Sequence, residues 1–335
     1  MTTVPSAAAT VPPTDPSADT AAVIAPYDGG GPCARAFARH GWRTVAVLPE
    51  RRLRPPAYRN ATLPAGYGGT VVHQGLRQTV KSLRALGVSA VAAGGAEGIE
   101  LAERIAWQLG LPGADPASSS LRYDRGAQAA RLARVGIPAL RGIRTARLAD
   151  AVAWARSYPA TGYLLAPAAA GTPVDAVECT DERQIGTAWP VLWHAAAQHS
   201  GSPHLVLTEL PGRRRYTVDT VTRPGPDGRP EHVVTGLRPD SQVGIRVPSD
   251  PPAPALTRYT TRVLDALGVV CGRATTRLAC DDDTAGDGPR LICALAAPVM
   301  TPADEAPRTA AGRLRPAGIP VPWTTPDTPF FQCRS

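Results

Sequence analysis

Short apolar runs alternate with amphipathic segments in the N-terminal part of the chain. Apolar residues dominate 22–26 and 43–48, as is typical of buried strands, and a segment with helical character separates them. A strand, a helix and a second strand in this order predict a right-handed crossover within a parallel sheet. The pattern repeats with a helix ending at Gly87, a strand at 89–93 and a helix ending at Gly110. The N-terminal part is therefore expected to form a doubly wound α/β sheet.

From about residue 119 the pattern changes to amphipathic helices and to strands that meet at turns. Helices are expected at 125–135, around 148–155, around 189–198 and around 256–267. Strands are expected at 163–165, 204–210, 216–222, 232–237, 274–280 and 289–296. Strands that are joined as hairpins and backed by helices predict an α+β layer.

These patterns divide the chain into five parts. Residues 1–20 are rich in Ala, Thr, Pro and Ser and have no apolar periodicity, so we expect a disordered tail. The doubly wound domain is expected over 21–118, and two α+β subdomains are expected over 119–200 and 201–300. Residues 301–335 are rich in proline and lack strong periodicity, which predicts a C-terminal segment rather than a further domain.

The composition, with 43% hydrophobic and 19% charged residues, is typical of a soluble globular protein. No apolar run approaches the roughly 20 residues of a membrane-spanning helix, and the N-terminus does not resemble a signal peptide. We therefore expect a cytoplasmic protein that does not associate with membranes. No CxxC pair is present and no histidine lies at zinc-ligand spacing, so the six cysteines are expected to be free thiols.

The formal net charge of +8 is compatible with a polyanionic partner. The arginines are spread along the chain, however, and are not interleaved with aromatic residues in one patch, so no nucleic-acid partner is expected. Lys81 is the only lysine among the 36 basic residues. This shortage of lysine affects every site that requires an ammonium group.

Four segments, taken in order, resemble a known family. They are a strand, turn and helix at 92–112, an Arg-x-Asp-Arg stretch with its helix at 121–138, and pairs of strands at 207–221 and 266–292. Together they resemble the ATP-grasp superfamily, specifically its carboxylate–amine or L-amino acid ligase branch. The resemblance covers residues 22 to about 300. It implies a Rossmann-like N-terminal domain, a small ATP-grasp subdomain over 119–200 and a large C-terminal subdomain over 201–300.

The resemblance also implies which residues hold the cofactors, ATP and Mg²⁺. In ATP-grasp ligases two lysines contact the phosphates, an acidic residue binds ribose, and two acidic residues with an asparagine bind Mg²⁺. This chain has Arg125 at the first lysine position and Ala166 at the second. On the ribose side, where an acidic residue is expected, the run from Arg213 to Arg215 precedes Tyr216. An arginine keeps the charge but replaces a compact ammonium with a planar fork, and alanine provides no cation.

The metal-binding strands differ further from the family. By register, Arg277 lies at the first acidic position, Cys293 at the second and Leu295 at the asparagine. A guanidinium repels Mg²⁺, while thiol and hydrocarbon groups offer no hard oxygen. We therefore expect neither a metal site nor Mg-ATP as a cofactor, and we interpret the acidic segment 281–287 as a solvated turn.

Three functions remain open at this point. The first is a pseudoenzyme that binds a protein partner or a small anionic ligand in specialised, amino-acid-derived metabolism. The second is a metal-free enzyme acting on an anionic metabolite in the former ATP cleft, with Cys293 as a candidate nucleophile. Packing on its apolar strand is the favoured interpretation of Cys293. The third is a divergent but active carboxylate–amine ligase in which the segment 281–287 recruits the metal.

Candidate ligand-binding residues share either a cationic side chain or a position at the expected interdomain hinge. They are Arg125, Glu209, Leu210, Arg215, Arg273 and Arg277. Glu209 and Leu210 belong to the hinge, whose main chain is expected to accept a flat ring. The sequence predicts neither the identity of the ligand nor the oligomeric state.

Overall fold

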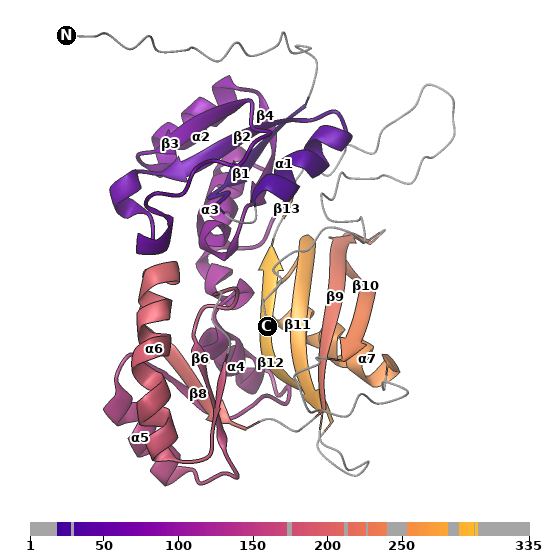
Figure 1. Ribbon diagram of the computed structural model, residues 1–335. Helices are drawn as coiled ribbons and strands as arrows, with labels where there is room; N and C mark the ends of the chain where they lie inside the picture. The colour runs from indigo at the N-terminus through magenta and orange to yellow at the C-terminus, as the bar shows by residue number, and fades with distance from the viewer. Residues whose placement is uncertain are drawn as a thin grey trace, which may run out of the picture.

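The computed structural model describes residues 19–27, 30–172, 176–210, 214–225, 227–239, 253–280, 288–297 and 299–300. Three sheets and the helices that cover them make up this part of the chain (Figure 1). Among the described helices, none is both long enough and apolar enough to span a bilayer.

The N-terminal sheet contains four parallel strands in the order β4-β1-β2-β3, with β13 antiparallel at the β4 edge. Its strands are β1 (Thr20–Ile24), β2 (Arg43–Pro49), β3 (Gly69–His73), β4 (Val88–Ala93) and β13 (Val299–Met300). Since β1 pairs with both β2 and β4, the strand order reverses direction beside β1. Such a reversal is the hallmark of a doubly wound sheet.

Helices cover both faces of this sheet. The helix α1 (Gly30–Arg39) packs Phe37 against Ala21 and Val23 on one face. The helices α2 (Leu76–Ala85) and α3 (Ile99–Leu109) pack on the other face, where Leu83 and Ile105 are buried. The expected doubly wound α/β domain is thus confirmed. Short 3-10 helices lie at η1 (Arg51–Leu53), η2 (Pro56–Tyr58), η3 (Ala96–Gly98) and η4 (Pro116–Arg122).

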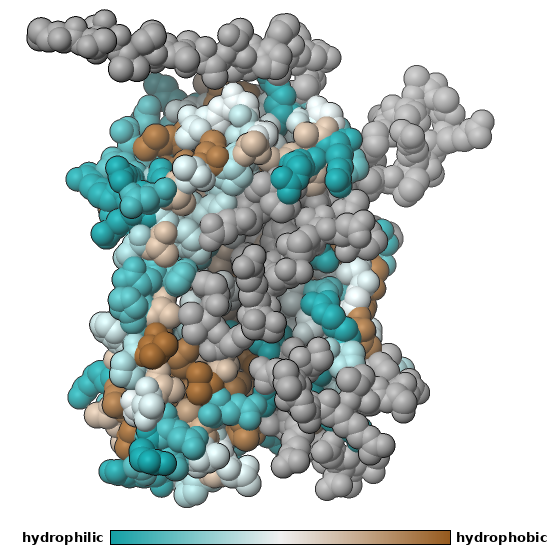
Figure 2. Space-filling model, viewed as in Figure 1, coloured by the Kyte–Doolittle hydropathy of each residue, from teal (hydrophilic) through white to brown (hydrophobic). Residues whose placement is uncertain are grey.

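The middle sheet has the antiparallel order β5-β8-β6-β7. Its strands are β5 (Gly142–Thr145), β8 (Leu205–Glu209), β6 (Tyr163–Pro167) and β7 (Val177–Cys179). Helices α5 (Leu148–Ser157) and α6 (Glu182–Ser200) pack on one face and bury Ala151, Ile185 and Leu192 against Leu165 and Leu207. Val177 of β7 and Val191 of α6 are exposed. The space-filling view shows patches of apolar surface among polar residues at the lower left of the molecule (Figure 2).

The C-terminal sheet has the antiparallel order β10-β9-β11-β12. Its strands are β10 (Pro230–Pro239), β9 (Arg214–Pro224), β11 (Gly272–Cys280) and β12 (Arg290–Ala297). One face packs on α7 (Ala253–Ala266) and on α4 (Arg125–Arg134), around the buried side chains of Tyr216, Leu264 and Leu132. Hairpin-connected strands backed by helices agree with the expected α+β layer.

Two arrangements cross the expected boundary at residue 200. β8 follows that boundary in sequence, yet it pairs with β5 and β6 in the middle sheet. Conversely, α4 precedes the middle sheet in sequence but packs its Leu132 into the core of the C-terminal sheet. The chain passes from the middle sheet to the C-terminal sheet between Glu209 and Arg214, so the sheets divide about ten residues later than expected.

The four strands that the sequence pattern did not predict are all at sheet edges. They are β3, β5, β7 and β13. β1 also begins at Thr20, one residue inside the range expected for a disordered tail; residues 1–18 of that tail, and 301–335, lie outside the described residues. Edge strands are short and partly exposed, so they lack the continuous apolar run that marks a central strand.

Candidate functional site

Arg125 occupies the first position of α4, where the middle and C-terminal sheets approach each other (Figure 1). The preceding residue, Asp124, caps the helix by accepting a hydrogen bond of 2.9 Å from the Ala127 amide. Nη1 of Arg125 donates to the carbonyl oxygens of Pro167 and Ala169. Its Nε is buried and has no hydrogen-bond partner among the described residues. The guanidinium is thus held by neutral carbonyl groups at the end of β6 and on the loop that follows it.

A cavity lies directly beside this guanidinium. Its walls come from α4, the segment after it, β6, β8 and β12, with Arg125, Ala129, Leu132, Ala139, Leu140, Leu164, Ala166, Val206, Thr208, Leu291 and Ile292 as the lining residues. About 410 Å³ of space between atoms belongs to this cavity, including the part that opens to solvent. The enclosed part has a volume of only about 20 Å³, which is room for roughly one water molecule.

The expected hinge residues are already engaged within the protein. The Glu209 carboxylate pairs with Arg141 at 2.9 Å and with Arg290 at 3.1 Å, and it also accepts a hydrogen bond from the Arg141 amide. The Leu210 amide donates to the Gly162 carbonyl oxygen at 2.8 Å. The hinge residues therefore connect β8 to its neighbours. We expected the hinge main chain to accept a flat ring, but the Leu210 amide is already bonded within the protein.

One face of the C-terminal sheet carries the remaining arginines of the expected site. Alternation along β9 and β11 places Tyr216, Val218, Ala274 and Leu278 in the core, so residues between them lie on the opposite face. That face carries Arg215, Thr217, Asp219, Arg273, Thr275 and Arg277. Arg215 forms an ion pair with Glu178 of β7, which links the two sheets. The structure therefore brings Arg215, Arg273 and Arg277 together on one surface, while Arg125 lies beside the separate cavity.

Asp219 is an acidic residue of this face that the sequence interpretation missed. Its carboxylate pairs with Arg238 and accepts a hydrogen bond of 2.7 Å from the Thr275 hydroxyl. The signal was present in the alternation of β9, because polar Thr217 and Asp219 are interleaved with buried Tyr216 and Val218. Both carboxylate oxygens have protein partners, so Asp219 neutralises part of the arginine charge.

The positions assigned to metal ligands do come together across β11 and β12. In the antiparallel register Arg277 lies opposite Cys293, Thr275 opposite Leu295 and Arg273 opposite Ala297. Directly opposed residues have side chains on the same face of a sheet. The group of side chains is thus guanidinium, hydroxyl, thiol and hydrocarbon, which does not fit the oxygen ligands that Mg²⁺ requires.

Two further observations bear on metal and thiol chemistry. Within the described residues, no three His, Cys, Asp or Glu side chains are placed to hold a metal ion. The acidic segment 281–287 lies outside those residues. Cys293 is 6% exposed, and its neighbours along β12 include Ala294 of the hydrophobic core.

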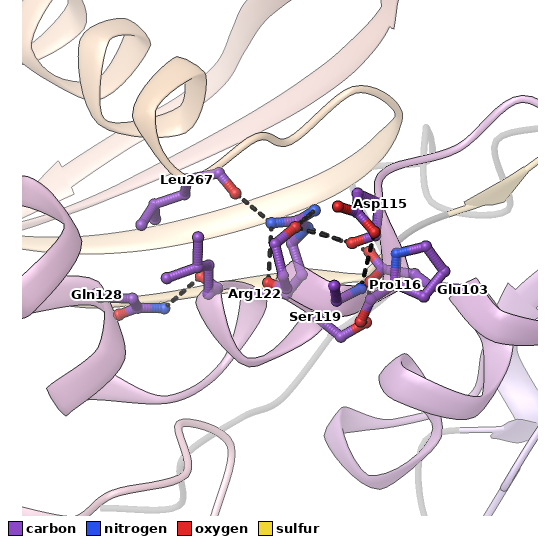
Figure 3. A network of polar contacts seen from close by, with 10 residues as sticks. Glu103, Asp115, Pro116, Ser119, Arg122, Gln128 and Leu267 are labelled. Carbon is purple, nitrogen blue, oxygen red and sulfur yellow. Dashed lines mark hydrogen bonds and ion pairs between the residues drawn. The ribbon is translucent and has the colours of Figure 1, made fainter.

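A buried polar network fixes α4 and hence Arg125 (Figure 3). Arg122 of η4 donates from Nε to Glu103 of α3 at 3.1 Å and from Nη1 to the carbonyl oxygen of Leu267. Burial raises the pKa of Glu103, an effect that Arg122 and the Ser119 hydroxyl oppose. The network joins the N-terminal domain to the turn after α7.

Gln128 makes the corresponding link to β12. Its side-chain nitrogen donates to the Ala294 carbonyl oxygen at 2.7 Å, and its side-chain oxygen accepts from the Ala294 amide at 3.0 Å. The Gln128 side chain thus pairs with the amide and the carbonyl group of Ala294 on the edge strand β12. A neighbouring strand would form the same two hydrogen bonds. The N-terminal half of α4 is therefore held against β12, whose Leu291 and Ile292 line the cavity.

Comparison with known proteins gives matches in three-dimensional structure only. No protein-family model matches the chain, and no curated protein matches its sequence. An L-amino acid ligase from Bacillus licheniformis aligns with a TM-score of 0.60 at 15% identity, covering 83% of this chain and 66% of the ligase. A biotin carboxylase from Campylobacter jejuni aligns with a TM-score of 0.55 at 16% identity, covering 82% of this chain and 65% of the carboxylase.

A third match is the N5-carboxyaminoimidazole synthetase from Staphylococcus aureus in complex with ADP. It has a TM-score of 0.58 at 9% identity, with 86% of this chain and 72% of the synthetase covered. This chain thus spans about two thirds of the length of the solved proteins that it matches. Each of the three alignments covers more than 80% of this chain. The chain therefore has the fold of the ATP-grasp ligases.

Proposed function

We propose that this protein uses the ATP-grasp fold for binding and does not catalyse Mg-ATP-dependent ligation. Its ligand is a small anion or a protein partner, and its context is specialised, amino-acid-derived metabolism. The structural similarity to a solved ligase and a solved carboxylase supports the fold. A fold by itself does not determine chemistry. The proposal therefore depends on the side chains of the cleft.

The register of β11 and β12 is the observation that carries this proposal. Arg277 and Cys293 oppose each other at the two positions where the fold implies acidic metal ligands. Phosphoryl transfer depends on cations and Mg²⁺ that neutralise charge as it moves, so the loss of oxygen ligands removes a major source of catalysis. Ala166, which replaces the second phosphate lysine, instead faces the apolar cavity beside Arg125.

The arginines of the C-terminal sheet favour an anionic ligand. Arg215, Arg273 and Arg277 share a face with Asp219, which pairs with Arg238, and Arg215 pairs with Glu178 of β7. Guanidinium groups bind carboxylates and phosphates through charge-assisted hydrogen bonds, so a face that carries three of them suits an anionic ligand. This arrangement supports retention of the cleft for ligand binding.

Calorimetric titration with Mg-ATP, run alongside an assay for ADP release over a panel of amino acids, tests the proposal. We expect no saturable binding of Mg-ATP at micromolar concentrations and no release of ADP above the rate without protein. Micromolar binding of Mg-ATP together with ADP release that depends on an amino acid would identify an active ligase instead.

A second candidate function is metal-free catalysis by Cys293, which the position of Arg277 directly opposite favours. Nucleophilic cysteines commonly have a cationic neighbour, although reactive thiols also need access to solvent. Candidate anionic metabolites should be screened for conversion by the wild type and by Cys293→Ala. Conversion that continues unchanged in Cys293→Ala would exclude this second function.

A further inference from the structure

Two neighbouring helices of the N-terminal domain carry exposed cations. Along α2, Arg77, Lys81 and Arg84 recur at the spacing of one helical face, and all three are exposed. The helix α3 adds Arg104, which is also exposed. The Arg84 guanidinium donates a hydrogen bond of 2.6 Å to the carbonyl oxygen of Gln108, so the two helices lie side by side. The four cations therefore belong to one surface.

Few carboxylates balance this positive charge. The helix α2 contains no acidic residue, and the acidic residues of α3 are Glu100 and Glu103. Glu103 is buried against Arg122, whereas Glu100 pairs with Arg104 on the surface at 3.7 Å. In the part of the chain that the structure describes, the three cations of α2 form no ion pair. The surface thus retains an excess of positive charge.

Exposed apolar side chains lie at one end of the same surface. Trp107 in the last turn of α3 is 60% exposed, and Leu86, the residue after α2, is 44% exposed. The bond between Arg84 and Gln108 brings these two helix ends together. Tryptophan and arginine are enriched among the residues that dominate the energy of protein interfaces. The group is named the α2–α3 surface and consists of Arg77, Lys81, Arg84, Leu86, Arg104 and Trp107.

The chemistry of the α2–α3 surface favours one class of occupant. A second copy of this chain seated on it would bring two sets of cations together, and like charges repel each other across an interface. Nucleic acids bind mainly through many phosphate contacts, which four cations beside two apolar side chains do not provide. An acidic protein segment complements both features, because its carboxylates pair with the cations and its apolar side chains cover Trp107 and Leu86.

We propose that the α2–α3 surface binds an acidic amphipathic helix of a partner protein. The three cations of α2 span about 10 Å along the helix axis, so a partner helix with carboxylates at the same spacing matches them. Apolar residues at one end of the partner helix contact Trp107 and Leu86. This inference goes beyond the proposed function, because the surface belongs to the N-terminal domain and does not depend on what the C-terminal sheet binds.

Calorimetry on the full chain with a synthetic acidic peptide tests the inference. The peptide is an alanine-rich helix with three Glu at the spacing of the α2 cations and two Leu in its last turn. A control peptide replaces the three Glu by Gln. At low ionic strength we expect the acidic peptide to bind at least about tenfold more tightly than the Gln peptide, because only its carboxylates attract the cations. Equal affinities, or no saturable binding at millimolar peptide, would overturn the inference, and this comparison needs no variant.

Variants of the full chain locate the binding site. The combined change Arg77→Gln, Lys81→Gln and Arg84→Gln should weaken binding of the acidic peptide by about tenfold or more, because it removes the cations and keeps good helix formers. Trp107→Ser should weaken binding by about 3- to 10-fold through the loss of apolar contact. Thermal unfolding identifies any variant that does not fold. Unchanged affinity in the folded variants would contradict the proposed site.

A matched control removes the same charge elsewhere. The combined change Arg134→Gln, Arg147→Gln and Arg183→Gln alters three exposed arginines outside the N-terminal domain. It should leave the affinity within about twofold of the wild type, because salt screens distant charges. Equal weakening by the two triple variants would show that binding follows net charge alone, and the inference would then be wrong.

Cosedimentation with vesicles of phosphatidylcholine and phosphatidylserine tests the other source of negative charge. We expect no more sedimentation of the wild type than of the α2 triple variant. Vesicle binding that the triple variant loses would assign the surface to an anionic membrane and refute the proposal.

Discussion

Nε of Arg122 lies 3.1 Å from Oε1 of Glu103, and the side chains of this ion pair are 2% and 0% exposed. The two residues come from η4 and α3, and Arg122 also reaches the carbonyl oxygen of Leu267 after α7. One buried pair thus connects the N-terminal domain to the C-terminal sheet. Burying two charges costs several kcal/mol, which their mutual attraction and hydrogen bonds offset.

Removal of one partner of this pair should destabilise the protein strongly. Arg122→Met leaves the Glu103 carboxylate buried without its counter-charge, so the free energy of unfolding should fall by about 3–5 kcal/mol. Urea unfolding followed by circular dichroism measures this change. Arg104→Gln provides the control, because the Arg104–Glu100 pair on the same helix is exposed and should contribute less than about 1 kcal/mol. A similar loss in both variants would contradict the prediction.

Stability should depend on pH through His73 at the end of β3. Its Nδ1 lies 2.8 Å from the Thr79 hydroxyl, and burial, with a smaller effect of Arg104, lowers the pKa of His73 below its usual value of 6.5. The folded state then binds fewer protons than the unfolded state between those two pKa values. Stability is therefore lost as the pH falls through 6.5 toward the folded pKa and is regained as the pH rises.

We expect the wild type to gain more stability between about pH 5 and pH 7.5 than His73→Gln does. Unfolding by urea at both pH values measures the difference. His194→Gln, which changes an exposed histidine on α6, should retain the pH dependence of the wild type. A titration by nuclear magnetic resonance that places the pKa of His73 above 6.5 would refute this prediction.

The described cysteines should differ in their reaction with alkylating reagents. Cys33, Cys179 and Cys293 are buried, whereas Cys271 and Cys280 are partly exposed. Burial also raises the pKa of the Cys33 thiol, which lowers its thiolate fraction. Iodoacetamide labelling of the native protein, followed by peptide mass spectrometry, should modify Cys271 and Cys280 first. Faster labelling of Cys293 than of these two would instead support the metal-free enzyme.

Substitution of glycine by alanine should destabilise the protein at Gly98 and stabilise it at Gly186. An added Cβ at Gly98, just before α3, would collide with the carbonyl oxygen of Ile24, so Gly98→Ala should cost about 1–3 kcal/mol. Gly186 lies in α6 with no atom within 4 Å of an added Cβ, so Gly186→Ala should stabilise by up to about 1 kcal/mol. Thermal unfolding of both variants checks the pair. Equal melting temperatures would show that the close packing at Gly98 is relieved at little cost.

Most strands were predictable from the sequence because burial on one or both faces leaves an alternating or a continuous apolar signal. Strands β1, β2, β4, β6, β8, β9, β10, β11 and β12 and the helices that cover them lie where the pattern indicates. The edge strands β3, β5, β7 and β13 do not, since they are only two to five residues long, whereas the predicted edge strands β10 and β12 have ten and eight residues. Their assignment required the partner strand to be known.

The candidate site, like the fold, was predictable from the sequence only in part. The residue types at Arg125, Ala166, Arg277 and Cys293 can be read directly from the chain, and they already argue against an Mg-ATP site. Tertiary structure alone decided that Glu209 and the Leu210 amide are engaged within the protein, that Asp219 joins the arginine face, and that an apolar cavity lies beside Arg125. The physical reason is that periodicity reports which side of an element is buried, whereas contacts between distant segments depend on which sheet each element joins.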